Sequence, residues 1–338
     1  MINYFKDKKV LVTGGTGFIG RNVVKRLLDL EADVTFCGHK NTNRQLDLGD
    51  TNNPPVKLQR DFTEWSDCEE TFGLNKKGKN RNQFDLVFHC AAVTHGAKFM
   101  NENPAGLVVD NTVMNTYLLD AAYKAGVKKF IFISSGAVYS GNDTCSEDSF
   151  LGKLPDVYFG VANMKRYGEK LCEFYSTKVK NPMQCLVVRP SNVYGHYDDF
   201  NPDTSHVMAA LIKKFVEEQN PFEVWGDGKD IRDFIYIDDF IEDLFLLTAR
   251  VTKFDIFNIA HGIGYSINEL ITLPVFYKIK KIKYLKGKPS TVKERLFDIT
   301  KLNKFIGMGG RKRTSIECGI DKTMEWYDYV TFDINKAL

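Results

Sequence analysis

A glycine-rich segment, TGGTGFIG at residues 13–20, constrains the fold of this 338-residue chain more than any other feature. It follows a short apolar run and precedes VVKRLLDL, whose apolar residues recur at helical spacing. Between a strand and a helix, Gly14 permits a tight turn, Gly17 lets backbone approach a pyrophosphate, and Gly20 allows close helix–strand packing. The helix N-terminus then directs free N–H groups at the phosphates. A plain glycine turn is the alternative. The preceding strand, the following helix and the regular spacing of the three glycines favour a dinucleotide site.

Short apolar runs alternate with helical patterns over the first half of the chain. Strands are expected at 9–13, 32–37, 84–92, 128–134 and 184–188, and helices at 105–125 and 158–178. This alternation is typical of an α/β fold with a doubly wound parallel sheet, whose central strands are buried on both faces. After residue 190 the composition changes, and helices are expected at 205–218 and 238–249. We predict an NAD(P)-binding Rossmann domain at 1–190 and a smaller substrate lobe at 191–338, with some strands or helices returning to the first domain.

Composition and charge exclude several other classes of protein. The 46 basic and 43 acidic residues give a net charge of +3, which leaves no electrostatic footprint for nucleic acid or an anionic membrane. No stretch of 18 residues lacks charged side chains, so no transmembrane helix is expected. The N-terminus lacks a secretory signal and the seven cysteines form no C-x-x-C pair, which favours free thiols in a reducing cytoplasm. No cluster has metal-ligand spacing, so we expect no metal.

The end of the second predicted strand bears on the choice between NAD and NADP. An acidic residue there would bind the ribose 2′-hydroxyl of NAD, but the sequence reads Cys37-Gly38-His39-Lys40. Gly38 leaves room, and Lys40 or Arg44 could pair with a 2′-phosphate. The same bases could equally form a solvated loop face. The missing carboxylate tilts the prediction toward NADP.

Further motifs resemble a single family along nearly the whole chain. They are Asp61-Phe62, FHCAA at 88–92, the helical Asn111, SSGAVY at 134–139, RPSNVYG at 189–195, WGDGKDIRDFIYIDD at 225–239, ERLFDITKL at 294–302 and GIDKTMEWY at 319–327. With TGGTGFIG, these segments are similar to the extended short-chain dehydrogenase/reductases of the NAD-dependent epimerase/dehydratase family, which act on nucleotide sugars. The segment at 194–214 resembles GDP-sugar members, among them GDP-fucose synthase, so the resemblance implies a GDP-linked substrate.

The resemblance assigns cofactor and substrate roles to individual residues. The implied cofactor contacts are Gly14, Thr16, Gly17, Phe18, Ile19, Gly38, His39, Lys40, Asp61, Phe62, Ala91, Ala92, Ser134, Lys165 and Arg189. The implied substrate contacts are Thr94, His95, Ser135, Asn192, Val207, Trp225, Arg232 and Arg295. Arg232 is expected to meet a diphosphate, which a guanidinium fork matches bidentately. Family members pair two helices across a dimer, which implies a homodimer through 105–125 and 158–178. Burial of these helices within one subunit is the alternative.

The catalytic motif departs from the family at one position. In the family, a Tyr four residues before a Lys takes the hydroxyl proton as hydride leaves, and the Lys lowers the pKa of that Tyr. Ser135 and Lys165 match the family's Ser and Lys, but Val161 stands at the tyrosine position, and valine transfers no proton. Three interpretations stay open. Tyr158 substitutes from the same helical face, or Lys165, Ser135 and water act without a tyrosine, or the chain binds its ligands without catalysis. The catalytic candidates are Ser135, Lys165 and Tyr158.

Other positions narrow the implied reaction. Family dehydratases carry Thr-Asp-Glu where this chain has Ser135-Gly136-Ala137, so dehydration is not expected. The Cys and His with which GDP-fucose synthase epimerises C3 and C5 correspond to Ala137 and Tyr197. The resemblance therefore implies hydride transfer between NAD(P) and C4 of a GDP-linked hexose or heptose, in the synthesis of capsule or glycan precursors. A nucleotide-sugar 4-epimerase and a catalytically silent cofactor-binding protein are the alternatives.

Overall fold

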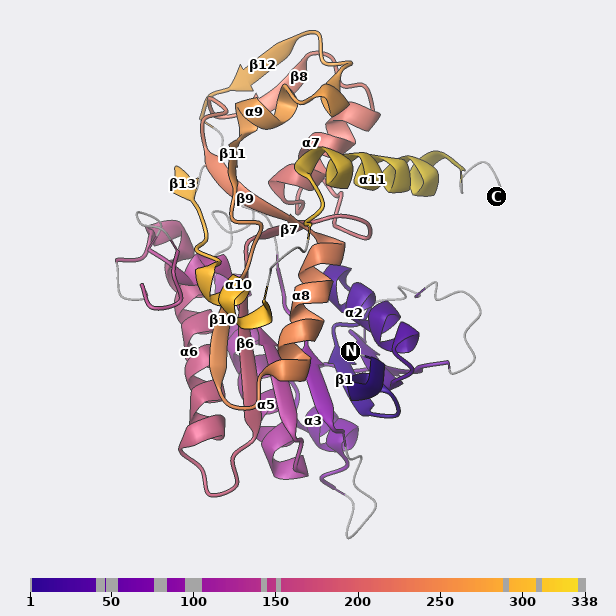
Figure 1. The fold of residues 1–338 in the computed structure, drawn as a ribbon, viewed down its shortest axis with the longest axis vertical. Helices are drawn as coiled ribbons and strands as arrows, with labels where there is room; N and C mark the ends of the chain where they lie inside the picture. Colours follow the sequence, from indigo (N-terminus) through magenta and orange to yellow (C-terminus); the bar gives the residue numbers. More distant parts are fainter. Residues whose placement is uncertain are drawn as a thin grey trace.

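A parallel sheet of seven strands, in the order β10-β6-β5-β4-β1-β2-β3, forms the centre of the computed structural model (Figure 1). The structure describes residues 2–40, 46, 54–75, 84–94, 105–140, 145–149, 153–287, 292–307 and 312–333. The strands of the sheet are β1 (Lys9–Thr13), β2 (Asp33–Gly38), β3 (Val56–Gln59), β4 (Leu86–His89), β5 (Lys129–Ile133), β6 (Gln184–Pro190) and β10 (Asp255–Ile259). All neighbouring strands run parallel, and the chain winds outward from β1 in both directions. The predicted doubly wound α/β fold is confirmed.

Helices cover both faces of this sheet. Val10 and Val12 of β1 pack in one core cluster, whereas Leu11 packs in a second cluster. The first cluster includes residues of α2 (Phe18–Asp29) and α8 (Ile237–Arg250). The second includes residues of α3 (Trp65–Phe72), α5 (Val109–Ala125) and α6 (Phe159–Thr177). Successive side chains of a strand point to opposite faces, so central strands buried on both faces read as uninterrupted apolar runs.

The later part of the chain builds a lobe beyond the carboxyl ends of the strands and also returns to the sheet. One small sheet contains β7 (Asn192–Tyr194), β9 (Ile231–Tyr236), β11 (Gly264–Ser266) and β13 (Glu294–Arg295), while β8 (Phe222–Trp225) pairs with β12 (Ile282–Leu285). The helices of the lobe are α7 (Val207–Val216), α9 (Ile267–Ile271) and α11 (Ile316–Asp328). β10 and α8 lie on the seven-stranded sheet, and α10 (Thr300–Ile306) packs on β10.

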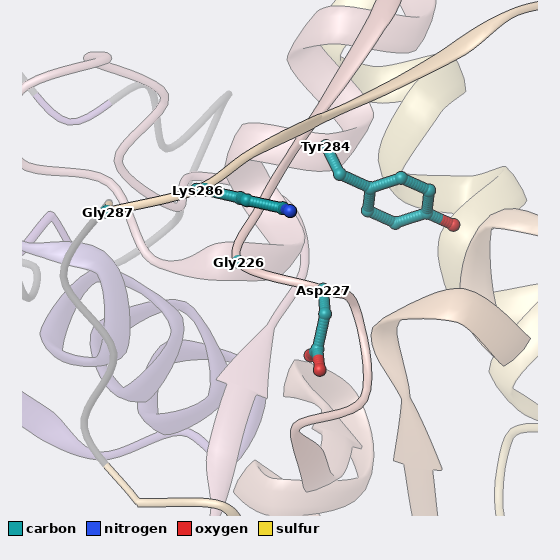
Figure 2. Close-up of a pocket in the computed structure, with 5 residues that line it drawn as sticks. All are labelled: Gly226, Asp227, Tyr284, Lys286 and Gly287. Carbon is teal, nitrogen blue, oxygen red and sulfur yellow. The ribbon is translucent and has the colours of Figure 1, made fainter.

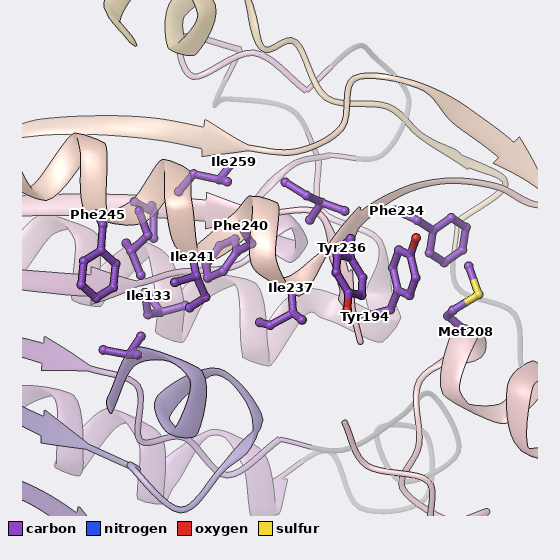
Figure 3. Packing of buried hydrophobic residues seen from close by; sticks show 14 of the residues in the cluster. Ile133, Tyr194, Met208, Phe234, Tyr236, Ile237, Phe240, Ile241, Phe245 and Ile259 are labelled. Atoms are coloured by element: carbon purple, nitrogen blue, oxygen red, sulfur yellow. The ribbon is translucent and has the colours of Figure 1, made fainter. Parts of the chain in front are cut away.

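One hydrophobic cluster joins the sheet to the lobe (Figure 3). It runs from Phe245 on α8 through Tyr236 and Tyr194 to Met208 on α7. The two tyrosines are buried, and their ring centroids lie 5.8 Å apart. This shared core holds the lobe over the carboxyl ends of the strands, where open parallel sheets bind ligands. Within the described ranges, no helix is long and apolar enough to cross a membrane.

Candidate active site

The glycine-rich loop lies between β1 and α2, as the sequence predicts. Gly14 adopts a positive φ of 65°, and a Cβ atom there would lie 2.6 Å from the backbone nitrogen of Ala91. Gly17 precedes α2, and no side chain caps that helix. The N–H groups of its first turn, which includes Phe18 and Ile19, therefore have no side-chain acceptor there. A pyrophosphate fits such a helix N-terminus, because its oxygens accept these hydrogen bonds.

Of the two bases predicted to follow β2, the structure describes Lys40. Gly38 lies against the loop, because a Cβ atom there would lie 3.0 Å from Thr16 Cγ2. Lys40 Nζ lies 2.7 Å from Oδ2 of Asp67, whose side chain is only 8% exposed. The sequence analysis gave Lys40 or Arg44 as a possible partner of a 2′-phosphate, and in the structure Lys40 pairs with a carboxylate. Arg44, the other predicted base, lies outside the described residues.

Asp61 and Phe62 follow the next strand, β3. Asp61 Oδ1 accepts hydrogen bonds from the backbone N–H (3.0 Å) and the hydroxyl (2.6 Å) of Thr63. These bonds hold the pKa of Asp61 below its usual value, so the carboxylate is charged at neutral pH. His39 Nε2 lies 3.7 Å from Asp61 Oδ2. The ring of Phe62 is buried in the cluster beneath α3 and α5.

The segment after β4 is braced by buried amide groups. Asn111 Nδ2 donates to the backbone oxygens of Val93 (2.9 Å) and Leu107 (2.7 Å), and its Oδ1 accepts from the Val93 N–H at 2.9 Å. This bracing fixes the path of Ala91 and Ala92 past the glycine-rich loop, where the sequence predicts the cofactor.

His89 is a core residue rather than a candidate base. Its two ring nitrogens lie 2.8 Å from Thr13 Oγ1 and 2.8 Å from Asn115 Oδ1. Burial lowers the pKa of His89 to about 4, so the ring is neutral at neutral pH. Across the described parts of the chain, no group of three or more His, Cys, Asp or Glu side chains could hold a metal ion.

Ser135 follows the carboxyl end of β5, and Lys165 on α6 reaches the same strand end. Lys165 Nζ donates to the backbone oxygen of Ile133 at 2.8 Å. Burial lowers the pKa of Lys165 to about 8, and the Glu169 carboxylate on the next helical turn opposes that change. Ser135 Oγ accepts a hydrogen bond from the Ala137 N–H at 3.1 Å. Among the described contacts, the Ser135 hydroxyl proton and two of the three ammonium protons of Lys165 have no other acceptor, so they can serve a ligand.

Ser134 and Arg189, predicted as cofactor contacts, belong to a buried network behind this site. Arg189 Nε and Nη2 donate to the two carboxylate oxygens of Glu169 at 2.9 and 2.7 Å, and Ser134 Oγ donates to the same carboxylate. Arg189 Nη1 contacts the hydroxyl of Tyr139 at 3.1 Å, and the arginine is 1% exposed. We correct the predicted role of both residues to an internal one. The sequence motifs predict that both residues lie at strand ends, but they do not predict the direction in which each side chain points.

Tyr158 lies in the turn that precedes α6 and packs in an apolar cluster with Val161. The guanidinium of Arg295 lies 4.6 Å from the centroid of the Tyr158 ring. The described contacts thus attach Tyr158 to Arg295 and not to Ser135 or Lys165. The sequence did not anticipate this neighbour, because Arg295 lies on a distant strand.

Arg232 and Arg295 occupy paired positions on the neighbouring strands β9 and β13. Arg232 Nη1 donates to the backbone oxygen of Ile231 at 2.8 Å, and its Nη2 lies 3.4 Å from Asp230 Oδ2. Nε and Nη2 of Arg295 are buried, and they have no hydrogen-bond partner among the described residues. A buried, unsatisfied guanidinium costs free energy, so this pair of arginines is suited to an anionic ligand such as a diphosphate.

The other predicted substrate contacts lie on several different elements. Asn192 on β7 donates to a backbone oxygen of β9 at 2.8 Å, and Val207 begins α7. Trp225 ends β8 and is 37% exposed. Thr94 is exposed beyond β4, and His95 lies outside the described residues.

A cavity of about 430 Å³ opens at the end of the β8–β12 ladder, directly after Trp225 (Figure 2). Its lining is Gly226, Asp227, Tyr284, Lys286 and Gly287. A carboxylate, an ammonium group and an aromatic ring thus come together in the lobe, away from the glycine-rich loop.

Tyr197 fastens the lobe to the helix after the glycine-rich loop. Lys25 Nζ donates to the Tyr197 hydroxyl at 3.1 Å, and the Arg21 guanidinium lies 4.7 Å from the ring centroid. Trp326 of α11 packs edge-on at 5.1 Å. The backbone of Tyr197 has a φ of 69°, which is uncommon for a residue other than glycine. The side chain is therefore held by α2 and α11.

The sequence analysis did not identify two acidic residues, Glu169 and Asp67, that hold other side chains in place. Glu169 follows Lys165 by one helical turn, and that spacing could have identified it. Asp67 meets Lys40 only through the packing of α3 beside β2, for which the sequence carries no local signal.

A doubly wound parallel sheet, with a glycine-rich loop between its first strand and a helix N-terminus, defines the class of dinucleotide-binding α/β proteins. Residues 10–260 match the profile of the NAD dependent epimerase/dehydratase family. The chain belongs to this family.

Relatives with assigned activities extend over nearly the whole chain. The GDP-L-colitose synthase of Yersinia pseudotuberculosis is 28% identical over 331 residues, covering 94% of this chain and 97% of the relative. GDP-L-fucose synthase 1 of Arabidopsis thaliana is 28% identical over 336 residues, covering 95% and 94%. A UDP-glucose 4-epimerase of Thermotoga maritima, solved with UDP-glucose, superposes with a TM-score of 0.81 at 25% identity, covering 95% of this chain and 99% of that one.

Proposed function

We propose that the chain is a nucleotide-sugar oxidoreductase that transfers a hydride between NAD(P) and C4 of the sugar. The observation that carries the proposal is the guanidinium of Arg295 beside Arg232, in the lobe above the glycine-rich loop, because its buried Nε and Nη2 have no hydrogen-bond partner among the described residues. One site suits the pyrophosphate of a dinucleotide and the other suits the diphosphate of a second nucleotide. Two anionic ligands of this kind match the two substrates of a nucleotide-sugar redox reaction.

A GDP-linked hexose or heptose is the proposed substrate. Two relatives that span nearly the whole chain are named for GDP-linked sugars, and the segment at 194–214 resembles the same group. The product would serve the synthesis of capsule or glycan precursors in the cytoplasm.

The residues at the end of β5 supply the proposed chemistry of the chain. The nicotinamide, when bound, accepts or gives the hydride. The Ser135 hydroxyl donates a hydrogen bond to the reacting sugar oxygen, and the free protons of Lys165 hold ribose hydroxyls and favour negative charge on that oxygen. With Val161 at the tyrosine position and Tyr158 held against Arg295, we assign the proton transfer to water at Ser135 and Lys165.

The contacts of Tyr197 support redox chemistry at C4 over epimerisation at C3 and C5. The side chain at this position is bound to Lys25 and packed against Arg21 and Trp326. Ala137, at the corresponding cysteine position, carries no proton. The chain therefore lacks both of the acid–base groups that epimerisation at C3 and C5 requires.

Two other functions remain as alternatives. A nucleotide-sugar 4-epimerase is favoured by the similarity to the Thermotoga maritima UDP-glucose 4-epimerase, and it would retain its cofactor through turnover. A catalytically silent binder is favoured by Val161 alone.

A homodimer through α5 and α6 is part of the proposal. These helices expose large apolar side chains at Val109 (62%), Phe159 (62%) and Phe174 (45%). Burial of such a row against a second copy removes apolar surface from water.

The experiment that tests the function uses purified protein with added NAD(P) or NAD(P)H and with GDP-, UDP-, dTDP- and CDP-sugars, and follows absorbance near 340 nm. A change with GDP-sugars is expected. If the ligands bind by calorimetry but absorbance and products stay unchanged, the oxidoreductase proposal is wrong and the silent binder replaces it. Product formation without net absorbance change would identify the 4-epimerase.

A further inference from the structure

We propose that Asp67 makes the dinucleotide site selective for NAD over NADP by holding Lys40 away from the ribose 2′ position. The inference rests on the proposed function, because it concerns the cofactor of that same site. It reverses the expectation drawn from the sequence, in which the missing acidic residue after the second strand favoured NADP.

The location of the 2′ position follows from the packing of the loop. Dinucleotide folds place the adenosine ribose at the carboxyl end of the second strand, next to the glycine-rich turn. Here that strand end is Gly38, and Thr16 of the loop packs close against it. The described bases that follow directly are His39 and Lys40, which places them next to a 2′ substituent.

Three bases among the described residues of this region each lie near a carboxylate. Lys40 Nζ lies 2.7 Å from Asp67 Oδ2, and His39 Nε2 lies 3.7 Å from Asp61 Oδ2. Arg60, at the end of β3, lies 3.0 Å from Glu70 Oε1. The positive charge of these three described bases is thus already balanced by acidic side chains.

The two side chains of the ion pair between Lys40 and Asp67 differ in burial. Separating them is therefore more costly for the buried partner, Asp67. Lys40 is 48% exposed, but Asp67 is 8% exposed and its Oδ2 also accepts the Asp61 N–H at 2.6 Å. If Lys40 turned to a phosphate, it would leave a buried carboxylate without its cation, which is costly. The carboxylates of Asp61 and Asp67 would also repel a group of −1.5 to −2 charge. A 2′-hydroxyl carries no charge and meets neither penalty.

The direct test measures binding of NADH and NADPH to the full chain by quenching of protein fluorescence, without any sugar. The wild type is expected to bind NADH more tightly. Asp67→Asn keeps an oxygen that can accept the Asp61 N–H but releases Lys40, so NADPH binding should tighten about tenfold or more, as one charge-assisted hydrogen bond does. NADH binding should change much less.

Two further variants separate the Lys40 contact from a general change of charge. Glu64→Gln removes the same charge from an exposed side chain three residues before Asp67, and no ion pair of Glu64 occurs among the described contacts; it should leave NADPH binding nearly unchanged. The double variant Asp67→Asn/Lys40→Met should lose the gain. Tighter NADPH than NADH binding by the wild type, or an equal gain in Glu64→Gln, would overturn the inference. Failure to bind either dinucleotide would instead refute the proposed function itself, and this inference with it.

Discussion

Replacing Lys165 with methionine should raise the stability of the protein at pH 7 while it abolishes turnover. Lys165 is buried, and burial lowers its pKa from 10.5 to about 8. At about 1.36 kcal/mol per pH unit, keeping the protonated side chain in the folded state costs about 3 kcal/mol below pH 8. Methionine removes that cost but leaves the Ile133 oxygen without its donor at 2.8 Å, a loss of about 1–3 kcal/mol. The expected net gain is about 1 kcal/mol, or about 2 °C in Tm.

The sign of the pH dependence distinguishes this explanation from simple repacking. The unfolded lysine titrates near 10.5 and the folded one near 8, so between these values the unfolded state binds more protons. The stability of the wild type therefore rises with pH across this window, relative to the variant. Above it both states are neutral, and the variant should be the less stable protein because of the lost hydrogen bond.

Thermal unfolding of both proteins between pH 7 and 10 checks the expectation, with loss of turnover at 340 nm as the functional readout. Lys170→Met is the matched control, because Lys170 lies on the same helix with 66% of its side chain exposed. Its pH profile should follow the wild type. Lys165→Met could instead be less stable than the wild type at pH 7, and by the same amount at pH 10. In that case the buried charge of Lys165 does not destabilise the folded state, and our reasoning is wrong.

Three further substitutions test the assigned roles. Arg295→Met should weaken nucleotide-sugar binding about tenfold or more by calorimetry while dinucleotide binding is kept, because it removes a charged donor; equal loss of both ligands would contradict a substrate role. Val161→Tyr should raise kcat about 100-fold, since a positioned acid–base group contributes about 10²–10⁴-fold; a folded, ligand-binding variant with unchanged kcat would count against Val161 as the limiting departure. Glu169→Ala should lower the free energy of unfolding in urea by about 3–5 kcal/mol, because Arg189 is then buried unpaired. The double variant Glu169→Gln/Arg189→Met should recover most of that loss, and an equally unstable double variant would show that the charge is not the cause.

Local patterns in the sequence predicted many of the helices and strands of the seven-stranded sheet and its covering layers. The helix expected at 238–249 is observed at Ile237–Arg250, and the strand expected at 128–134 is observed at Lys129–Ile133. Periodicity reports which residues face a core, and long periodic segments carry that signal strongly. The helix expected at 105–125 begins as a short 3₁₀ turn, and α5 proper spans Val109–Ala125. Such ends depend on neighbours that a local pattern does not contain.

The sequence by itself determined the strand, glycine turn and helix of the dinucleotide site. Gly14 and its neighbours allow a backbone conformation that is unfavourable for other residues. It also determined the parallel α/β architecture through the apolar period of each element. Only the tertiary structure decided that Lys40 pairs with Asp67, that Arg189 turns inward to Glu169, and that Tyr158 packs on Arg295. Each of these contacts joins residues from separate elements. The direction and partner of a long polar side chain are set by the packing of those elements, and no local period encodes them.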